Sequence, residues 1–87
     1  MSTAPKRKKN LAWRKIEDEV VIIDLEKDRQ FHELNDTAAL IWELCDGETS
    51  VSAIAETIAE NFEIAPEDAQ LEVNEFITLL TEKALLA

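Results

Sequence analysis

The stretch FHELNDTAALIWELCDG, Phe31 to Gly47, contains an abrupt change of periodicity. A short alternating run, typical of a strand, ends at Leu34. The side chain of Asn35 or Asp36 can then accept hydrogen bonds from the free N–H groups that begin a helix. Gly47 fits the left-handed position that follows a helix end. The stretch therefore predicts a strand joined directly to a helix. The apolar face of that helix consists of Ala38, Leu40, Ile41, Trp42, Leu44 and Cys45.

The residues before this stretch predict two more strands and a basic tail. Val20–Leu25 is rich in β-branched residues, which favour strands, and it is apolar on both faces. Leu11–Ile16 is a weaker strand candidate. The short polar segment Glu26–Asp28 suits a hairpin loop, so Arg29–Leu34 is predicted to return as the third strand. We expect a three-stranded antiparallel meander, preceded by a disordered basic tail at residues 1–10.

The residues after Gly47 predict two further helices. Thr49 or Ser50 can cap the first of them, and Pro66 fits the first turn of the second. Both segments carry apolar stripes at helical spacing. The stripes are Val51, Ile54, Ala55, Ile58, Ala59 and Phe62, and then Ala69, Val73, Phe76, Ile77, Leu80 and Ala84. The predicted fold is therefore an α+β domain at residues 11–87, in which a three-stranded antiparallel sheet precedes three helices, in the style of a small winged-helix domain.

The chain offers few groups for catalysis or metal binding. Cys45 is the single cysteine and His32 the single histidine, so neither a disulfide nor a cluster of metal ligands is predicted. One glycine is too few for a phosphate-binding loop. The paired carboxylates fall on predicted solvent faces, whereas acid–base catalysis needs a desolvated carboxylate. We expect a protein that is not an enzyme and has no cofactor.

Composition also bears on location. No apolar run approaches the roughly 20 residues that a membrane span needs. The basic N-terminus lacks the apolar segment of a secretory signal. We therefore expect a cytoplasmic protein without a membrane partner.

The net charge of −10 is unevenly distributed along the chain. Residues 1–30 hold eight Lys or Arg against six Asp or Glu, whereas residues 31–87 hold one Lys against thirteen Asp or Glu. A nucleic-acid-binding surface needs the opposite sign, because it must meet phosphates. The acidic part instead favours basic peptides or a basic face on a partner protein. No nucleic-acid partner is expected.

Two long segments resemble the PqqD family, which is named for a protein of pyrroloquinoline quinone biosynthesis. They are RQFHELNDTAALIWELCDGETSVSAIAETIAENF, residues 29–62, and DAQLEVNEFITLLTEKALL, residues 68–86. The matching features are Leu34-Asn35, Thr37-Ala38-Ala39, Ile41-Trp42, Cys45-Asp46-Gly47, Val51, Ile54, Val73, Phe76, Leu80 and Leu85-Leu86. The same fold is called the recognition element of ribosomally synthesised and post-translationally modified peptides, or RiPPs.

The resemblance implies a peptide-binding chaperone rather than an enzyme. In the family, the leader segment of a precursor peptide adds as a strand beside the third strand, and its apolar side chains enter a groove against the third helix. The domain then presents the precursor to a modifying enzyme, often a radical SAM enzyme. The peptide-binding residues implied here are Arg29, Gln30, Phe31, His32, Glu33, Leu34, Asp68, Glu72, Val73, Phe76, Ile77 and Leu80.

The sequence also departs from the family pattern. Members that serve quinone synthesis carry an Arg-Gly element and a Leu-Leu-x-Pro-Glu stretch before Leu-Asn, and they end in Gly-Trp. Here the corresponding segments read VVIIDLEKDRQFHEL and ALLA. The chain therefore resembles the broader group, which also serves lasso-peptide and radical-SAM peptide pathways.

Other hypotheses remain beside leader binding. A non-enzymatic adaptor or a weak homodimer could use the free edge of the sheet, so a monomer and a weak dimer both stay open. A winged-helix DNA binder fits the charge poorly, since the last two predicted helices carry no Lys or Arg before Lys83. An acyl carrier protein would need an Asp-Ser-Leu context at a helix start, and neither Ser50 nor Ser52 provides it.

Overall fold

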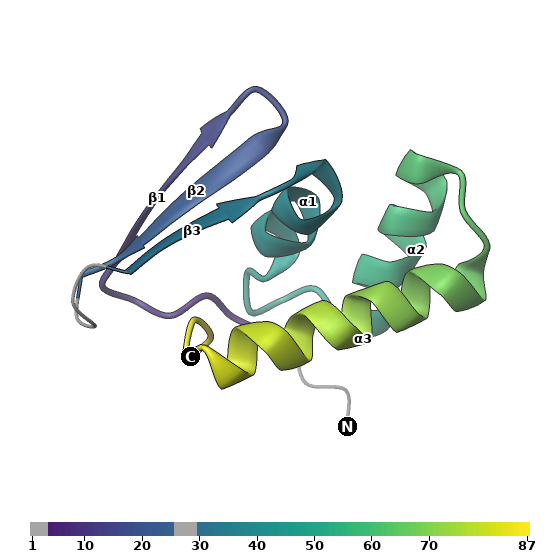
Figure 1. Ribbon diagram of the computed structural model, residues 1–87. Coiled ribbons are helices and arrows are strands. Elements are labelled where there is room, and N and C mark those ends of the chain that lie inside the picture. Colours follow the sequence, from purple (N-terminus) through teal and green to yellow (C-terminus); the bar gives the residue numbers. More distant parts are fainter. Residues whose placement is uncertain (1–3, 26–29) are drawn as a thin grey trace.

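A computed structural model describes residues 4–25 and 30–87. It contains the strands β1 (Leu11–Ile16), β2 (Glu19–Asp24) and β3 (Gln30–Leu34), followed by the helices α1 (Asp36–Leu44), α2 (Val51–Phe62) and α3 (Pro66–Glu82). The strands form an antiparallel sheet in the order β1-β2-β3, and the three helices gather on one side of it (Figure 1). The predicted α+β architecture is confirmed. The likeness to winged-helix domains stays a prediction.

The register of the sheet decides which side chains face the helices. Val20 and Ile22 of β2 are completely buried, so they define the inner face. Leu34 pairs with Val20, and His32 pairs with Ile22. Residues directly opposite each other in an antiparallel pair project to the same face. His32 and Leu34 therefore point toward the helices, and the residues between them point to the outer face.

The helix starts follow the capping residues of the sequence. The Ala38 N–H donates to Asn35 Oδ1 at 3.0 Å, so Asn35 rather than Asp36 caps α1. In the same way the Ala53 N–H donates to Ser50 Oγ at 3.1 Å and identifies Ser50 as the cap of α2. Pro66 occupies the first turn of α3, as predicted. Side-chain hydrogen bonds thus fix the starts of α1 and α2, and the restricted backbone of proline favours the start of α3.

Trp42 lies at the centre of the core. Its side chain is 0% exposed, and its ring meets the ring of Trp13 edge to face, with centroids 6.1 Å apart. The burial of Trp42 agrees with its place on the predicted apolar face of α1. The other buried apolar residues come from the sheet, all three helices and the C-terminal segment; they are Val20, Ile22, Leu34, Ala39, Ile41, Cys45, Ile54, Ala55, Ile58, Ala69, Val73, Leu80 and Leu85.

The N-terminal segment differs from the disordered tail that its composition predicted. Residues 1–3 lie outside the described part. In the described part, Lys6 pairs with Asp46 and Arg7 pairs with Leu86 as isolated antiparallel bridges. The Arg7 N–H donates to the Cys45 carbonyl at 2.9 Å, and the Lys8 N–H donates to the Leu85 carbonyl at 3.1 Å. The segment therefore lies between the end of α1 and the C-terminus of the chain.

The cause of this order is the end of α1. A helix leaves its last carbonyl groups without partners, and α1 has no basic residue in its last turn. Arg7 supplies the missing donor, because its Nη1 donates to the carbonyls of Trp42 at 3.0 Å and Glu43 at 2.8 Å. The Arg7 guanidinium also lies 5.1 Å from the centre of the Trp13 ring. A charge that composition assigned to solvent is therefore part of the folded domain.

Cys45 is a buried thiol, in agreement with the prediction that it behaves as a small apolar residue. Its side chain is fully buried and its Sγ–H donates to the Ile41 carbonyl at 3.2 Å. Burial raises the pKa of the Cys45 thiol from its usual 9.0 to about 11, against a smaller opposing effect of Arg7. The neutral thiol is therefore strongly favoured in the folded state.

We expect Cys45 to resist alkylation in the folded protein and to react rapidly once urea unfolds the chain. The change in pKa alone lowers the thiolate fraction at neutral pH about 100-fold, and burial adds a steric barrier. The contribution of Cys45 to the free energy of unfolding is therefore constant below pH 9.0, and it becomes destabilising as pH rises from 9.0 toward about 11. Mass spectrometry after iodoacetamide treatment measures the first effect. Urea melts of the protein and of Cys45→Ala measure the second, which the variant should lack.

Candidate functional site

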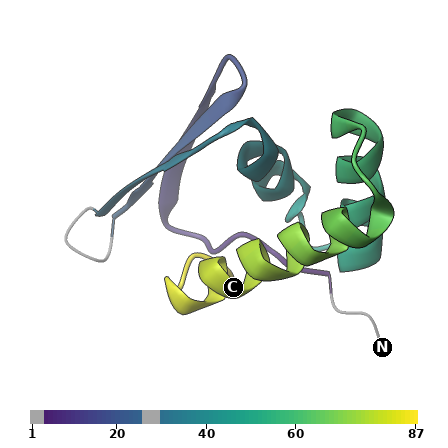
Figure 2. The same ribbon diagram turned by 45° about the vertical axis from the view of Figure 1, so that its right-hand side comes forward.

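The outer edge of β3 is the first component of a candidate binding site. β3 pairs with β2 along one side, and within the described residues no strand pairs with its other side. A strand at the edge of a sheet presents backbone N–H and C=O groups to which another extended chain can add. In Figure 2, β3 runs directly into α1, with α3 crossing below them in this view. The open edge thus ends beside two helices.

A shallow hollow begins just past the end of β3, between the start of α1 and the middle of α3. Its volume is about 190 Å³. We call it the α1–α3 groove, and it is lined by Asn35, Thr37, Ala38, Ile41, Glu72 and Phe76. Phe76 is half-buried and packs against the core, so its ring forms an apolar wall with fixed support. An extended peptide on β3 would reach this groove as it passes the junction between β3 and α1.

The residues that were expected to bind peptide divide into two sets on β3. His32 and Leu34 face the helices, whereas Phe31 and Glu33 face away from them. Leu34 is already part of the core. The Nε2 of His32 is buried and has no hydrogen-bond partner among the described residues. Arg29 and the side chain of Gln30 lie outside the described residues.

The expected residues on α3 also occupy different environments. Glu72 and Phe76 line the α1–α3 groove. Val73 and Leu80 are 0% and 1% exposed, so their side chains lie in the core of the domain. Ile77 follows Val73 by four residues and Phe76 follows it by three, so these two side chains flank the buried stripe on opposite sides.

The structure adds residues that sequence analysis did not assign to a site. Leu79 is 42% exposed, and it follows Glu72 by seven residues on the groove side of α3. Asn35, Thr37 and Ala38 line the groove from the start of α1. Helical spacing from Phe76 could have indicated Leu79. The residues of α1 depend on how α1 and α3 pack, for which the sequence carries no local signal.

The surroundings of the groove are acidic. Glu72 lines it directly, and Glu75 and Asp68 are exposed on the same helix. Asp68 lies in the first turn of α3 and does not line the groove. Negative charge beside an apolar wall favours peptides with Lys or Arg next to apolar residues, mainly by speeding their association.

The sequence match decides the family. The model of the family "Coenzyme PQQ synthesis protein D (PqqD)" matches residues 19–86, which run from the start of β2 to the penultimate residue of the chain. The chain belongs to the PqqD family. No curated protein matches the sequence.

Solved structures resemble this PqqD-family chain in fold. One is TbiB1 in complex with the TbiA(beta) leader peptide, with 22% identity, coverage of 93% of each chain and a TM-score of 0.83. Another is lasso peptide synthetase B1 complexed with the leader peptide, with 21% identity, coverage of 97% of this chain and 98% of that one, and a TM-score of 0.83. Both likenesses extend over nearly the whole of this chain.

A third structure carries the family name. It is the solution structure of the PqqD truncation of Methylobacterium extorquens PqqCD, described as a functional and stand-alone RiPP recognition element. It shares 24% identity with this PqqD-family chain, covers 95% of it and 87% of its own length, and has a TM-score of 0.70. The shared fold includes the sheet and the helices that form the candidate site.

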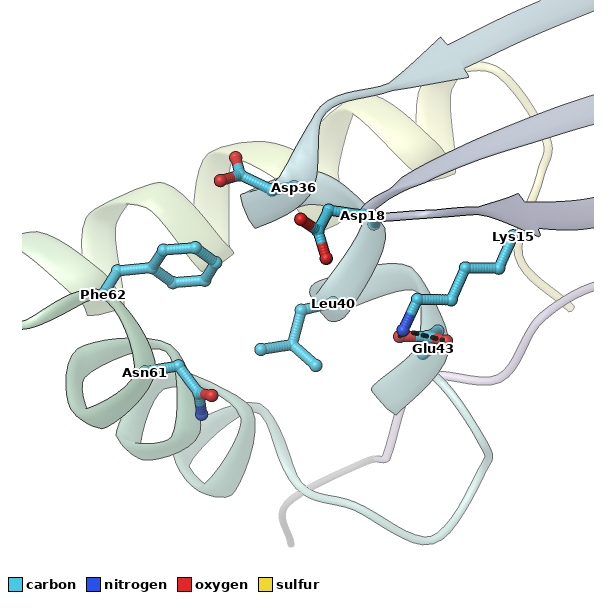
Figure 3. A pocket seen from close by; sticks show the side chains of 8 residues that line it. Lys15, Asp18, Asp36, Leu40, Glu43, Asn61 and Phe62 are labelled. Carbon is cyan, nitrogen blue, oxygen red and sulfur yellow. Dashed lines mark hydrogen bonds and ion pairs between the residues drawn. The ribbon is translucent and has the colours of Figure 1, made fainter.

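A second hollow of about 300 Å³ lies on another side of α1 (Figure 3). It is lined by Lys15, Asp18, Asp36, Ala39, Leu40, Glu43, Asn61 and Phe62. Lys15 Nζ and Glu43 Oε1 form an exposed ion pair at 3.4 Å across one end of it. Its carboxylates are in contact with solvent, and an exposed ion pair contributes little to binding or stability. Of the two hollows, only the α1–α3 groove adjoins the β3 edge in this PqqD-family chain.

Among the described residues, no helix combines the length and apolar character that a membrane crossing requires. The described part of the chain contains no group of three His, Cys, Asp or Glu side chains arranged to hold a metal ion.

Proposed function

We propose that this PqqD-family chain binds the leader segment of a ribosomally made precursor peptide. The leader would add as a fourth strand beside β3 and place apolar side chains in the α1–α3 groove. The observation that carries the proposal is the open edge of β3 next to that groove. Support also comes from two structures of the same fold that are described as complexes with leader peptides.

The proposed role is that of a non-catalytic chaperone. The domain would hold the leader and present the rest of the precursor to a modifying enzyme, of the radical SAM class or another. The rigid connection between β3 and α1 suits this role, because Asn35 caps the helix directly after the strand. A receptor that is ordered in advance reduces the conformational entropy lost on binding. The pathway would be synthesis of pyrroloquinoline quinone or of another modified peptide.

An amide NMR titration with the precursor peptide encoded nearest this gene tests the proposal. We expect chemical-shift changes at residues 31–34 of β3 and at the residues that line the α1–α3 groove. A leader with proline at alternate positions is the matched control, because proline has no N–H to donate to the strand edge. Changes confined to the β1 edge, or equal binding of the proline variant, would contradict strand addition to β3.

A further inference from the structure

The outer face of the sheet is apolar at its centre and carries no helix. All three helices lie on the inner side (Figures 1 and 2). The side chains that project outward from β2 include Val21 and Ile23, and Phe31 projects outward from β3 with 57% of its surface exposed. Ile16 at the end of β1 is also exposed. A monomeric sheet normally leaves a polar face to solvent, so this face requires an explanation.

The register arranges the outer face in rows across the three strands. One row consists of Arg14, Val21 and Glu33, and the next consists of Ala12, Ile23 and Phe31. The first row is therefore basic on β1, apolar on β2 and acidic on β3. The two charged side chains of this row lie on opposite edge strands, with Val21 between them. Neither Arg14 nor Glu33 has an ion-pair partner in the described part of the chain.

We propose that this face binds a second copy of the chain. Two sheets would stack face to face about a two-fold axis that runs along β2, parallel to the strands. Such an axis places β1 of each copy over β3 of the other. Arg14 then meets Glu33 of the second copy, and the reverse pair forms by symmetry. Val21 and Ile23 meet their own counterparts in the centre.

The second row is complementary in shape under the same axis. Phe31 of each copy lies over Ala12 of the other, so the largest side chain of the row meets the smallest. Ala12 belongs to an apolar hollow of about 320 Å³ on the outer face, which is also lined by Trp13, Arg14, Ile16, Val21 and Ile23. In the dimer, the exposed ring of Phe31 enters this hollow of the second copy. An axis across the strands would instead place β1 on β1 and bring the two Arg14 side chains near each other.

The size of the face predicts a weak dimer. Two strands of six residues and one of five present a face of about 14 by 20 Å, or roughly 300 Å² per copy. Stable complexes bury about 800 Å² per partner. Association is therefore expected at high protein concentration. It leaves the β3 edge and the α1–α3 groove open, so the inference does not depend on the proposed function.

Sedimentation velocity over a concentration series up to millimolar protein tests the inference. The unaltered chain is expected to change from monomer to dimer, and Val21→Asp is expected to remain a monomer because it places a charge in the apolar centre. Arg14→Glu and Glu33→Arg should each weaken the dimer about 10-fold, since each brings like charges together. The double variant Arg14→Glu/Glu33→Arg should restore association to within about 3-fold, because the pairs form again with reversed sign.

Several results would overturn the inference. A strictly monomeric chain at millimolar concentration would leave this face to a different protein. A dimer that tolerates Val21→Asp would use another surface, such as the edge of β3. If the double variant associates as weakly as the single variants do, Arg14 does not pair with Glu33 of the second copy. All the substituted side chains are partly or fully exposed, and circular dichroism would verify that each variant is folded.

Discussion

Replacing Phe76 with aspartate is expected to abolish leader-peptide binding. Phe76 lines the α1–α3 groove opposite the start of α1, and its ring packs partly against the core. A leader side chain that enters the groove would bury the new carboxylate without a partner, beside the existing charge of Glu72. Loss of a central apolar contact typically costs about 2 kcal/mol or more, so affinity should fall at least ~30-fold. Isothermal titration calorimetry with the precursor peptide measures this change.

Leu71→Asp is the matched control for this substitution. Leu71 lies on the same helix and is 59% exposed, but it does not line the groove. The substitution Leu71→Asp introduces the same charge into α3, and we expect this variant to bind the leader peptide as the original chain does. Leu79→Asp provides a second variant on the groove side that disturbs the core less than Phe76→Asp, and it should also weaken binding. Folded Phe76→Asp and Leu79→Asp variants that bind as the original chain does would exclude α3 as the wall of the site.

Replacing Trp42 with alanine is expected to destabilise the domain by about 3–5 kcal/mol. The indole is fully buried, contacts the ring of Trp13 and fills the centre of the core. Alanine would leave a cavity among residues of the sheet and the helices. A domain of this length has a free energy of unfolding of about 4–13 kcal/mol, so much of the population would be unfolded. Urea denaturation followed by circular dichroism measures the loss.

The variant Trp42→Phe distinguishes the contribution of the aromatic ring to stability from the contribution of the indole N–H. The buried Nε1 of Trp42 has no hydrogen-bond partner among the described residues, so its N–H makes an unfavourable contribution. Phenylalanine keeps an aromatic ring and removes that group. Its cost should therefore be smaller than the cost of alanine by about 2 kcal/mol. Equal urea midpoints for Trp42→Ala and the unaltered chain would show that Trp42 is not central to the core.

The elements of the fold were predictable because their signals are local. The caps at Asn35 and Ser50, the proline at the start of α3 and the β-branched residues of β2 each act on neighbours within about one helical turn or one strand. These signals established the order of the elements and the junction between β3 and α1. Helical spacing of apolar residues placed Trp42 on the apolar face of α1.

The candidate site was predicted only in part. The sequence indicated β3 and α3 as the binding elements, and the structure places Phe76 and Glu72 on the α1–α3 groove. It could not distinguish Phe76 from Ile77, since both flank the same buried stripe. It also included Val73 and Leu80, which are enclosed in the core. Which side chains of α3 face the groove depends on how α3 packs against α1 and the sheet. The helical spacing of apolar residues does not predict that packing.

The N-terminal segment shows most clearly that local sequence patterns do not predict contacts between distant parts of the chain. Its composition indicates a free basic tail, but Arg7 binds carbonyl groups at the end of α1, 35 and 36 residues away in the sequence. The amino-acid sequence by itself determined the strands, the helices and their order, because hydrogen bonds and side-chain alternation act between near neighbours. Only the tertiary structure decided which charges are paired, which face of β3 meets the helices and which side chains remain open to a ligand, because those properties arise from contacts between distant parts of the chain.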